Sequence, residues 1–317
     1  MSKRTPEEAF HRQSVGSTLK EDFDKKDEHH FSNWLSFMLS LPLRKRMSKV
    51  DVFTQWSGLV GYVLAGFLAV CFPVQLAIPF NLHLGQYGSG LIRVMGMQLS
   101  IIGLFYWVFT RAKPKISSEC IALGTTVERI FYIGIGLISI YKHNLIPAML
   151  LVSVAAVDTT LSVITILIWS KTSRNASLKS YFCSVGQLMS FSSKWNYSSH
   201  AVQTLGLLQF VGAIFFLVFP STASQVLQIN NLGPHERGLF LVAILASGAI
   251  GFLNLTSGGA DCKAYNIAVV VYSVCLSMPL VGFLGLFLHH IPVGLAWYLL
   301  CLDGIGFVII NITLCMD

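Results

Sequence analysis

Two aspartates, Asp158 and Asp303, stand near the middle of long apolar runs and are the strongest sign of chemistry in this sequence. Each run opens on a proline, Pro147 or Pro292, and each aspartate follows its proline by eleven residues. At a rise of about 1.5 Å per residue, both carboxyls lie about 16 Å deep, near the middle of a bilayer core about 30 Å thick. A charged side chain there costs about 3 kcal/mol on the most lenient scale, so it generally has a function or a partner.

Glu128 and Arg129 place further charge inside another apolar run. The same depth arithmetic brings Arg129 within one helical turn of Asp158, which predicts an ion pair between them. Ser162 and Thr165 follow Asp158 at positions +4 and +7, on one helical face. The predicted polar core consists of Asp158, Asp303, Arg129, Glu128, Ser162 and Thr165.

Asp303 has no arginine of its own, because Glu128 and Arg129 correspond to Ser273 and Val274 at an offset of 145 residues. Asp303 must therefore share Arg129, find hydroxyl or backbone donors, or stay protonated. A carboxyl that stays protonated in the membrane is a candidate proton carrier. Polar residues between membrane helices also act as structural contacts, which is the alternative interpretation.

Histidine occurs in every loop that we expect on the outer side: His83, His143, His235, His289 and His290. Imidazoles titrate near neutral pH and bind metals, so an outer pH or metal sensor is a further hypothesis. The sequence contains no HxH or HExxH spacing, and we predict neither a metal site nor a cofactor.

The composition predicts the kind of element that holds these residues. Of the 317 residues, 54% are hydrophobic and 12% are charged, and the mean hydropathy is +0.64. Soluble domains contain about 25% charged residues. Several runs here reach the roughly 20 apolar residues needed to cross a bilayer, so we expect an all-α polytopic membrane protein.

Eight apolar runs are predicted to span the membrane. They cover residues 55–77, 90–110, 123–141, 146–169, 202–220, 238–256, 266–288 and 292–315. Phe72–Pro73 recurs as Phe219–Pro220, and Gly103 recurs as Gly251, at offsets close to that between the two aspartates. The sequence therefore predicts two four-helix repeats with short interfacial helices. The repeats are parallel, because an even number of spans returns the chain to the same side.

Lysine and arginine are distributed very unevenly between the two sides of this arrangement. Eighteen lie on one side and two on the other, with two more inside spans. The positive-inside rule therefore places both termini in the cytoplasm. The predicted units are a disordered tail (1–30), an interfacial basic segment (31–50), repeat 1 (51–169), a cytoplasmic linker with an interfacial segment (170–201) and repeat 2 (202–317).

The basic segment 31–50 combines an apolar helical face with a run of lysine and arginine. That pattern is typical of a helix that binds anionic headgroups, here those of the cytoplasmic leaflet. Any protein partner is also expected to bind on the cytoplasmic side, through residues 1–50 or 170–200. The net charge of +7 follows from membrane topology, so we predict no binding of nucleic acid.

Two classes of function follow from the polar core. The first is a proton-coupled or small-solute transporter that uses the midplane aspartates, and it predicts a polar crevice between the repeats. The alternative is a structural or accessory membrane protein, which predicts a dry, filled bundle. We expect no enzymatic activity, because the Tyr-Asp and Gly-x-Gly-Asp motifs of intramembrane aspartyl proteases are replaced by Val157-Asp158 and Leu302-Asp303.

Overall fold

The described part of the chain is folded into helices without a strand. The computed structural model describes residues 47–111, 120–173, 176–190, 197–229, 231–259 and 277–316. The predicted tail 1–30, residues 31–46 of the basic segment and residues 266–276 of the seventh predicted span lie outside these ranges.

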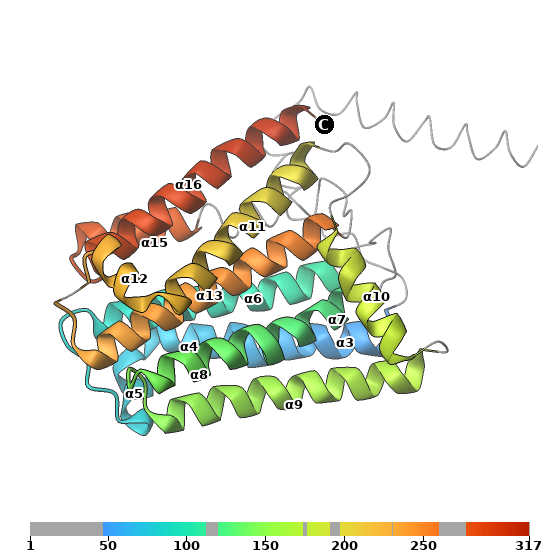
Figure 1. The fold of residues 1–317 in the computed structure, drawn as a ribbon, viewed down its shortest axis with the longest axis horizontal. Helices are drawn as coiled ribbons and strands as arrows, with labels where there is room; N and C mark the ends of the chain where they lie inside the picture. Colours follow the sequence, from blue (N-terminus) through green and yellow to red (C-terminus); the bar gives the residue numbers. More distant parts are fainter. Residues whose placement is uncertain are drawn as a thin grey trace, which may run out of the picture. The chain divides into compact units, whose positions relative to one another are not determined.

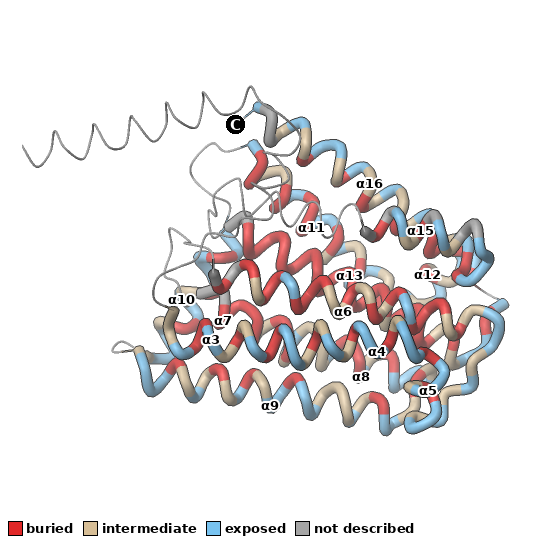
Figure 2. Tube along the Cα trace, turned by 180° about the vertical axis from the view of Figure 1, so that it is seen from behind, coloured by how far each residue is buried: buried red, intermediate tan, exposed pale blue. Residues whose placement is uncertain are grey.

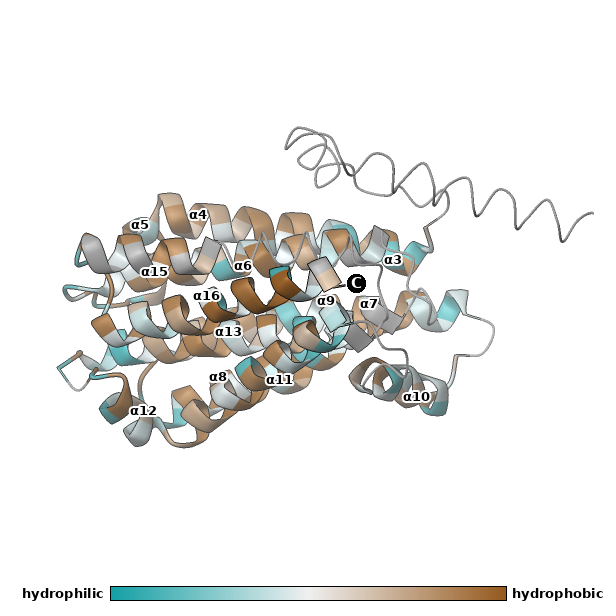
Figure 3. Ribbon diagram, turned by 90° about the horizontal axis from the view of Figure 1, so that it is seen from above, coloured by the Kyte–Doolittle hydropathy of each residue, from teal (hydrophilic) through white to brown (hydrophobic). Residues whose placement is uncertain are grey.

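Seven helices of the described chain are long and apolar enough to cross a membrane (Figures 1 and 3). They are α3–η1–α4 (Lys49–Trp56, Ser57–Leu64, Ala65–Cys71), α6 (Gly88–Arg111), α7–η3–α8 (Cys120–Val127, Glu128–Ile133, Gly134–Lys142), α9 (Ala148–Thr172), α11 (Tyr197–Val218), α13 (Pro234–Gly259) and α16 (Val293–Met316). The shorter helices are α5 (Pro73–Ala77), η2 (Ile78–Phe80), α10 (Leu178–Met189), α12 (Pro220–Val226) and α15 (Ser277–Phe287). The protein is therefore an all-helical, multi-pass membrane protein.

The first spanning helix differs at both ends from the predicted range 55–77. It begins at Lys49, because Ser48 and Asp51 cap it reciprocally, with Asp51 N donating to Ser48 Oγ at 3.1 Å. Lys49 and Val50 therefore belong to this helix and not to the basic segment. The helix ends at Cys71, since Pro73 has no backbone N–H and starts the separate helix α5.

The centre of the bundle is α13, which Figure 2 shows almost wholly buried. In its most apolar 18-residue stretch 94% of the residues are buried, whereas the figure for α9 is 17%. The exposed residues of α9 are largely apolar and include Met149, Val152 and Val163. Such a surface is favourable against lipid, so α9 lies at the periphery and buries only the one face that carries Asp158.

The two halves of the chain, here Lys49–Thr172 and Tyr197–Met316, turn at matching positions. The only non-glycine residues with positive φ in the described chain are Asn81 (52°), Asn144 (55°), Gln228 (53°) and His289 (54°). Asn81 and Gln228 are 147 residues apart, and Asn144 and His289 are 145 apart. The break at Phe72 (φ −127°, ψ 51°) likewise recurs at Phe219 (φ −119°, ψ 66°).

Glycine pairs bring the first two long helices of each half into close contact. A Cβ on Gly103 of α6 would lie 2.5 Å from the Gly58 carbonyl oxygen of η1. A Cβ on Gly206 of α11 would lie 2.5 Å from the Gly251 carbonyl oxygen of α13. Only glycine permits such a close approach of two helix backbones, which maximises van der Waals contact in lipid.

The predicted interfacial segment of the linker 170–201 contains a helix, α10, which lies across the ends of the long helices in Figure 1. Ser177 and Ser180 cap its N-terminus reciprocally. Its Tyr181 hydroxyl lies 2.6 Å from the hydroxyl of Thr126, and burial raises the pKa of Tyr181 because the phenolate would lose hydration. These contacts fasten α10 to α7.

Candidate functional site

The predicted residues of the first half meet in one buried polar cluster. The Tyr62 hydroxyl donates a hydrogen bond to Asp158 Oδ1. The Tyr106 hydroxyl donates to Glu128 Oε2 at 2.5 Å. Arg129 lies between these two pairs, with its guanidinium 5.2 Å from the Tyr62 ring centre and 4.7 Å from that of Tyr106. The cluster therefore contains two carboxyls and one cation, joined through aromatic side chains.

The direct Arg129–Asp158 ion pair predicted from depth does not form in the structure. Tyr62 stands between the two residues, since its hydroxyl contacts Asp158 and its ring faces Arg129. Arg129 Nη2 donates instead to Ser57 Oγ at 3.2 Å. The depth calculation gives the level of a residue along the bilayer normal but not the direction in which its side chain points. It therefore does not predict that the Tyr62 ring lies between Arg129 and Asp158.

Local helix geometry positions four of the six side chains of this cluster, whereas Tyr106 comes from the regular helix α6. Ser57 and Tyr62 lie in η1, and Glu128 and Arg129 lie in η3, and both segments have π-helical hydrogen bonding. A π segment accommodates an extra residue within a helix and occurs frequently at functional sites. Asp158 comes from a regular helix, α9. The cluster is thus built where two helices depart from regular α geometry.

Ser162 and Thr165 share the buried face of α9 with Asp158, as their spacing indicated. Both are fully buried, and Thr165 Oγ1 donates to the Leu161 carbonyl oxygen at 2.8 Å. Ser162 Oγ has no hydrogen-bond partner among the described residues. These two hydroxyls therefore continue the polar face of α9 without bonding the Asp158 carboxyl itself.

The second aspartate has a different set of partners. Gln209 Nε2 donates to Asp303 Oδ1 at 2.5 Å, and Asn254 Nδ2 donates to Gln209 Oε1 at 3.0 Å. All three residues are buried, and they come from α16, α11 and α13. Asp303 therefore does not share Arg129. Its donor is a side-chain amide, which the sequence analysis did not consider.

Sequence reasoning missed five members of the two clusters: Ser57, Tyr62, Tyr106, Gln209 and Asn254. They carry no charge, so they do not stand out within apolar runs. A signal was nevertheless available, because Tyr62 and Gln209 are 147 residues apart and Tyr106 and Asn254 are 148 apart. These are the offsets of the predicted repeat, so polar residues at matching positions marked both sites.

The predicted outer histidines form one pair. The His83 backbone N–H donates to His235 Nδ1 at 3.0 Å, and the two rings stack with centres 5.4 Å apart. His143, His289 and His290 are exposed at the turns before α9 and α16. Among the described residues, no group of three or more histidine, cysteine, aspartate or glutamate side chains could hold a metal ion.

Comparison with known proteins gives no relative for this chain: no family model, no curated protein and no solved structure matches it.

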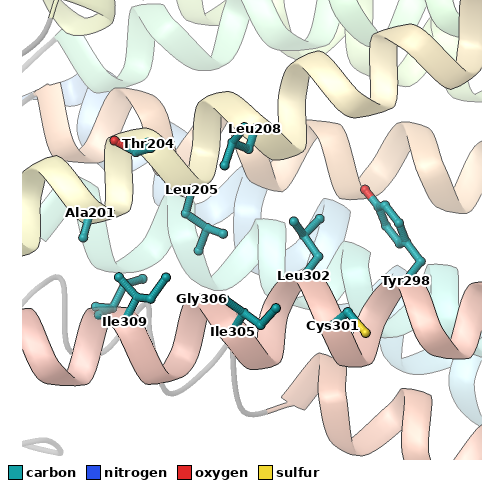
Figure 4. A pocket seen from close by; sticks show the side chains of 11 residues that line it. Ala201, Thr204, Leu205, Leu208, Tyr298, Cys301, Leu302, Ile305, Gly306 and Ile309 are labelled. Atoms are coloured by element: carbon teal, nitrogen blue, oxygen red, sulfur yellow. The ribbon is translucent and has the colours of Figure 1, made fainter.

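Two lateral grooves lie beside the clusters. A groove of about 640 Å³ runs between α11 and α16, where Leu205 of α11 and Leu302 of α16 both point into the space between the two helices (Figure 4). A second groove of about 370 Å³ lies between η3–α8 and α11 and reaches Glu128 and Tyr132. Both are lined mainly by apolar side chains. Neither of these two grooves is a polar crevice of the kind predicted between the repeats.

Proposed function

We propose that the protein is a proton-coupled transporter of a small solute, and that the cluster around Arg129 carries the proton. The observation that supports this function is the charge of the cluster. Asp158 and Glu128 are both buried beside a single guanidinium. If both carboxyls were ionised, the cluster would have a net charge of −1 inside the membrane.

An unbalanced charge at that depth is costly, so the cluster favours the binding of one proton. The two carboxyls accept hydrogen bonds from tyrosines whose rings both face Arg129. Each carboxyl therefore has a neutral donor and shares the same cation. Because the two carboxyls are nearly equivalent, either can hold the proton. A solute or a helix movement that favours one carboxyl would move the proton to it from the other. Such a displacement couples proton transfer to transport.

The proposal includes the arrangement of two parallel four-helix repeats, with the eighth span predicted over residues 266–288 and both termini in the cytoplasm. The matching turns and glycine contacts support it. So do reciprocal contacts between the halves. Gly90 at the start of α6 packs on the His290 carbonyl, and Gly238 near the start of α13 packs on the Leu145 carbonyl. Leu145 and His290 are 145 residues apart, which fits a pseudo-two-fold axis.

A structural or accessory role is the second candidate, and two observations favour it. Every carboxyl of the two clusters already has a side-chain hydrogen-bond donor. The two grooves expose mainly apolar surface. In this role the polar residues hold the helices together. Residues 1–50 would then bind anionic lipid or a protein partner on the cytoplasmic side.

The test is proton flux into proteoliposomes under an imposed pH gradient, with and without a panel of small solutes. We expect flux in the wild type and none in a folded variant with Asp158→Asn and Asp303→Asn. The matched control is Glu236→Gln, because Glu236 is a buried carboxyl near the start of α13 that bonds Tyr87 N and lies outside both clusters. No flux in the wild type, together with reduced thermal stability of the double variant, would favour the structural role.

A further inference from the structure

The groove between η3–α8 and α11 differs from the α11–α16 groove in having a buried carboxyl in its wall. Glu128 lines it and is only 1% exposed. The carboxyl accepts the Tyr106 hydrogen bond at Oε2. A volume of about 370 Å³ lies within the range of small-molecule sites.

A second polar group lies close to this carboxyl. The Tyr132 hydroxyl, four residues along the same helix, is buried against Gly248 of α13 and has no hydrogen-bond partner among the described residues. The ring of Tyr132 is held against Phe210 of α11, with 4.9 Å between the ring centres. Leaving a buried hydroxyl unpaired costs about 1–3 kcal/mol, so a ligand that bonds it recovers that energy.

The charge near Glu128 favours a cationic ligand. The only guanidinium of the cluster, that of Arg129, faces the Tyr62 and Tyr106 rings and bonds Ser57. With Asp158 also ionised, the cluster lacks one positive charge. A proton supplies that charge in the proposed function, and an ammonium group beside Glu128 would supply the same charge from the groove.

The rest of the groove is suited to a hydrocarbon chain. It extends along η3 and α8 to Ser139, eleven residues beyond Glu128, which corresponds to about 16 Å of helix. Ile135 and Ile214 contribute to its walls from the two sides. Ile135 is 63% exposed, so the groove opens toward the surface that faces lipid.

We propose that this groove binds a single-chain amphiphile whose ammonium head lies against Glu128 and Tyr132 and whose chain runs along α8 and α11. A fatty acid or a phospholipid carries negative charge that Glu128 repels. A fatty alcohol can bond Tyr132 but does not balance the charge. The proposal adds a ligand class to the Glu128 end of the cluster, and it concerns binding alone, so it holds whether or not the protein transports protons.

The experiment is photolabelling of the full-length protein in nanodiscs, without a pH gradient, by diazirine derivatives of tetradecylamine, tetradecanol and tetradecanoic acid. A charge-assisted contact predicts roughly tenfold stronger labelling of groove peptides by the amine than by the alcohol. Glu128→Gln keeps an acceptor for Tyr106 and should remove this preference. Its thermal unfolding shows whether it folds.

A second pair of variants tests the position without touching the carboxyl. Ile135→Trp fills the groove and should abolish amine labelling of these peptides. Ile138→Trp is the control, because Ile138 is an exposed isoleucine of the same helix that does not line the groove. Equal labelling by amine and alcohol, or amine labelling that survives Ile135→Trp, would overturn the proposal. Amine labelling that persists in the variant with Asp158→Asn and Asp303→Asn, where flux is expected to be lost, would separate this site from the transport step.

Discussion

In the first half of the chain Asp158 accepts a hydrogen bond from a tyrosine, and in the second half Asp303 accepts one from an amide. The two donors, Tyr62 and Gln209, lie at matching positions 147 residues apart. The side chains that contact these two donors also lie at matching positions. Tyr106 packs edge-on against Tyr62, with ring centres 5.2 Å apart, and Asn254 bonds Gln209. The same framework thus supports an aromatic site with charges in one half and an amide site in the other.

This difference indicates which half carries the proton. Asp303 has a neutral amide donor and no cation among its described partners, so its ionised form would leave a net charge of −1 in the second cluster, and it keeps its proton. The first cluster surrounds a guanidinium with two tyrosine rings and two carboxyls. Its charge depends on how many protons it binds. We therefore assign the exchangeable proton to the first half and a structural role to the amides of the second.

Helix geometry differs between the halves at the same place. Gly58 and Tyr62 are four residues apart, whereas their counterparts Gly206 and Gln209 are three apart. The additional residue lies within η1, which has π-helical bonding, and α11 is a regular α-helix. One inserted residue in the first half therefore explains why the offset between the halves changes from 148 to 147 along this helix.

The largest effect is expected from deletions that test this insertion. Deleting Leu208 from α11 rotates one end of the helix by about 100° relative to the other, which separates Gly206 and Gln209 from their partners. A loss of more than about 5 kcal/mol of stability follows. Deleting Val60 from η1 converts that segment to regular α-helix and keeps both flanks in place. Thermal unfolding in detergent compares them, and equal losses would contradict the insertion.

Removing the cation of the first half should have the next largest effect. Arg129→Leu leaves two carboxyls buried without compensation, and we expect a loss of about 3–5 kcal/mol. Arg93→Leu is the control, because Arg93 is exposed and, among the described residues, bonds only the Val70 carbonyl oxygen, at 3.3 Å. Its replacement should cost less than about 1 kcal/mol. Similar unfolding temperatures for the two variants would show that Arg129 does not balance the cluster.

A smaller effect is expected from removing the donors of the two aspartates. Tyr62→Phe keeps the ring beside Arg129 and removes one hydrogen bond, which should cost about 1–3 kcal/mol. Gln209→Leu removes two hydrogen bonds, to Asp303 and from Asn254, so its cost should be about twice as large. Chemical denaturation in mixed micelles measures both. A larger loss of stability for Tyr62→Phe than for Gln209→Leu would contradict the structural role assigned to the amides of the second half.

The smallest effect concerns the matching turns before α9 and α16. Asn144 and His289 both adopt left-handed backbone conformations, which asparagine tolerates better than histidine. Replacing either residue by glycine relieves the steric cost, by less than about 1 kcal/mol. We expect a slightly larger gain for His289→Gly than for Asn144→Gly in paired thermal scans. Destabilisation by both substitutions would show that the two turns depend on their side chains.

The spans were predictable because lipid imposes a simple requirement, namely about 20 apolar residues without a break. All seven spanning helices of the described chain overlap predicted runs. The charged members of the sites were predictable for the same reason, since charge is rare inside such runs. The uncharged partners were not predictable from residue type alone, since only their matching positions in the two halves mark them, and the π segments were not predictable because no residue type marks a helix as underwound.

The central claim is that the first cluster holds an exchangeable proton, and infrared spectroscopy of carboxyl groups tests it most directly. The carbonyl absorption of protonated carboxyl groups would be recorded in nanodiscs, over the pH range in which the protein stays folded. We predict a pH-dependent band in the wild type that is lost in Asp158→Asn or Glu128→Gln and retained in Asp303→Asn. A band that depends only on Asp303, or no pH-dependent band in the wild type, would contradict the account.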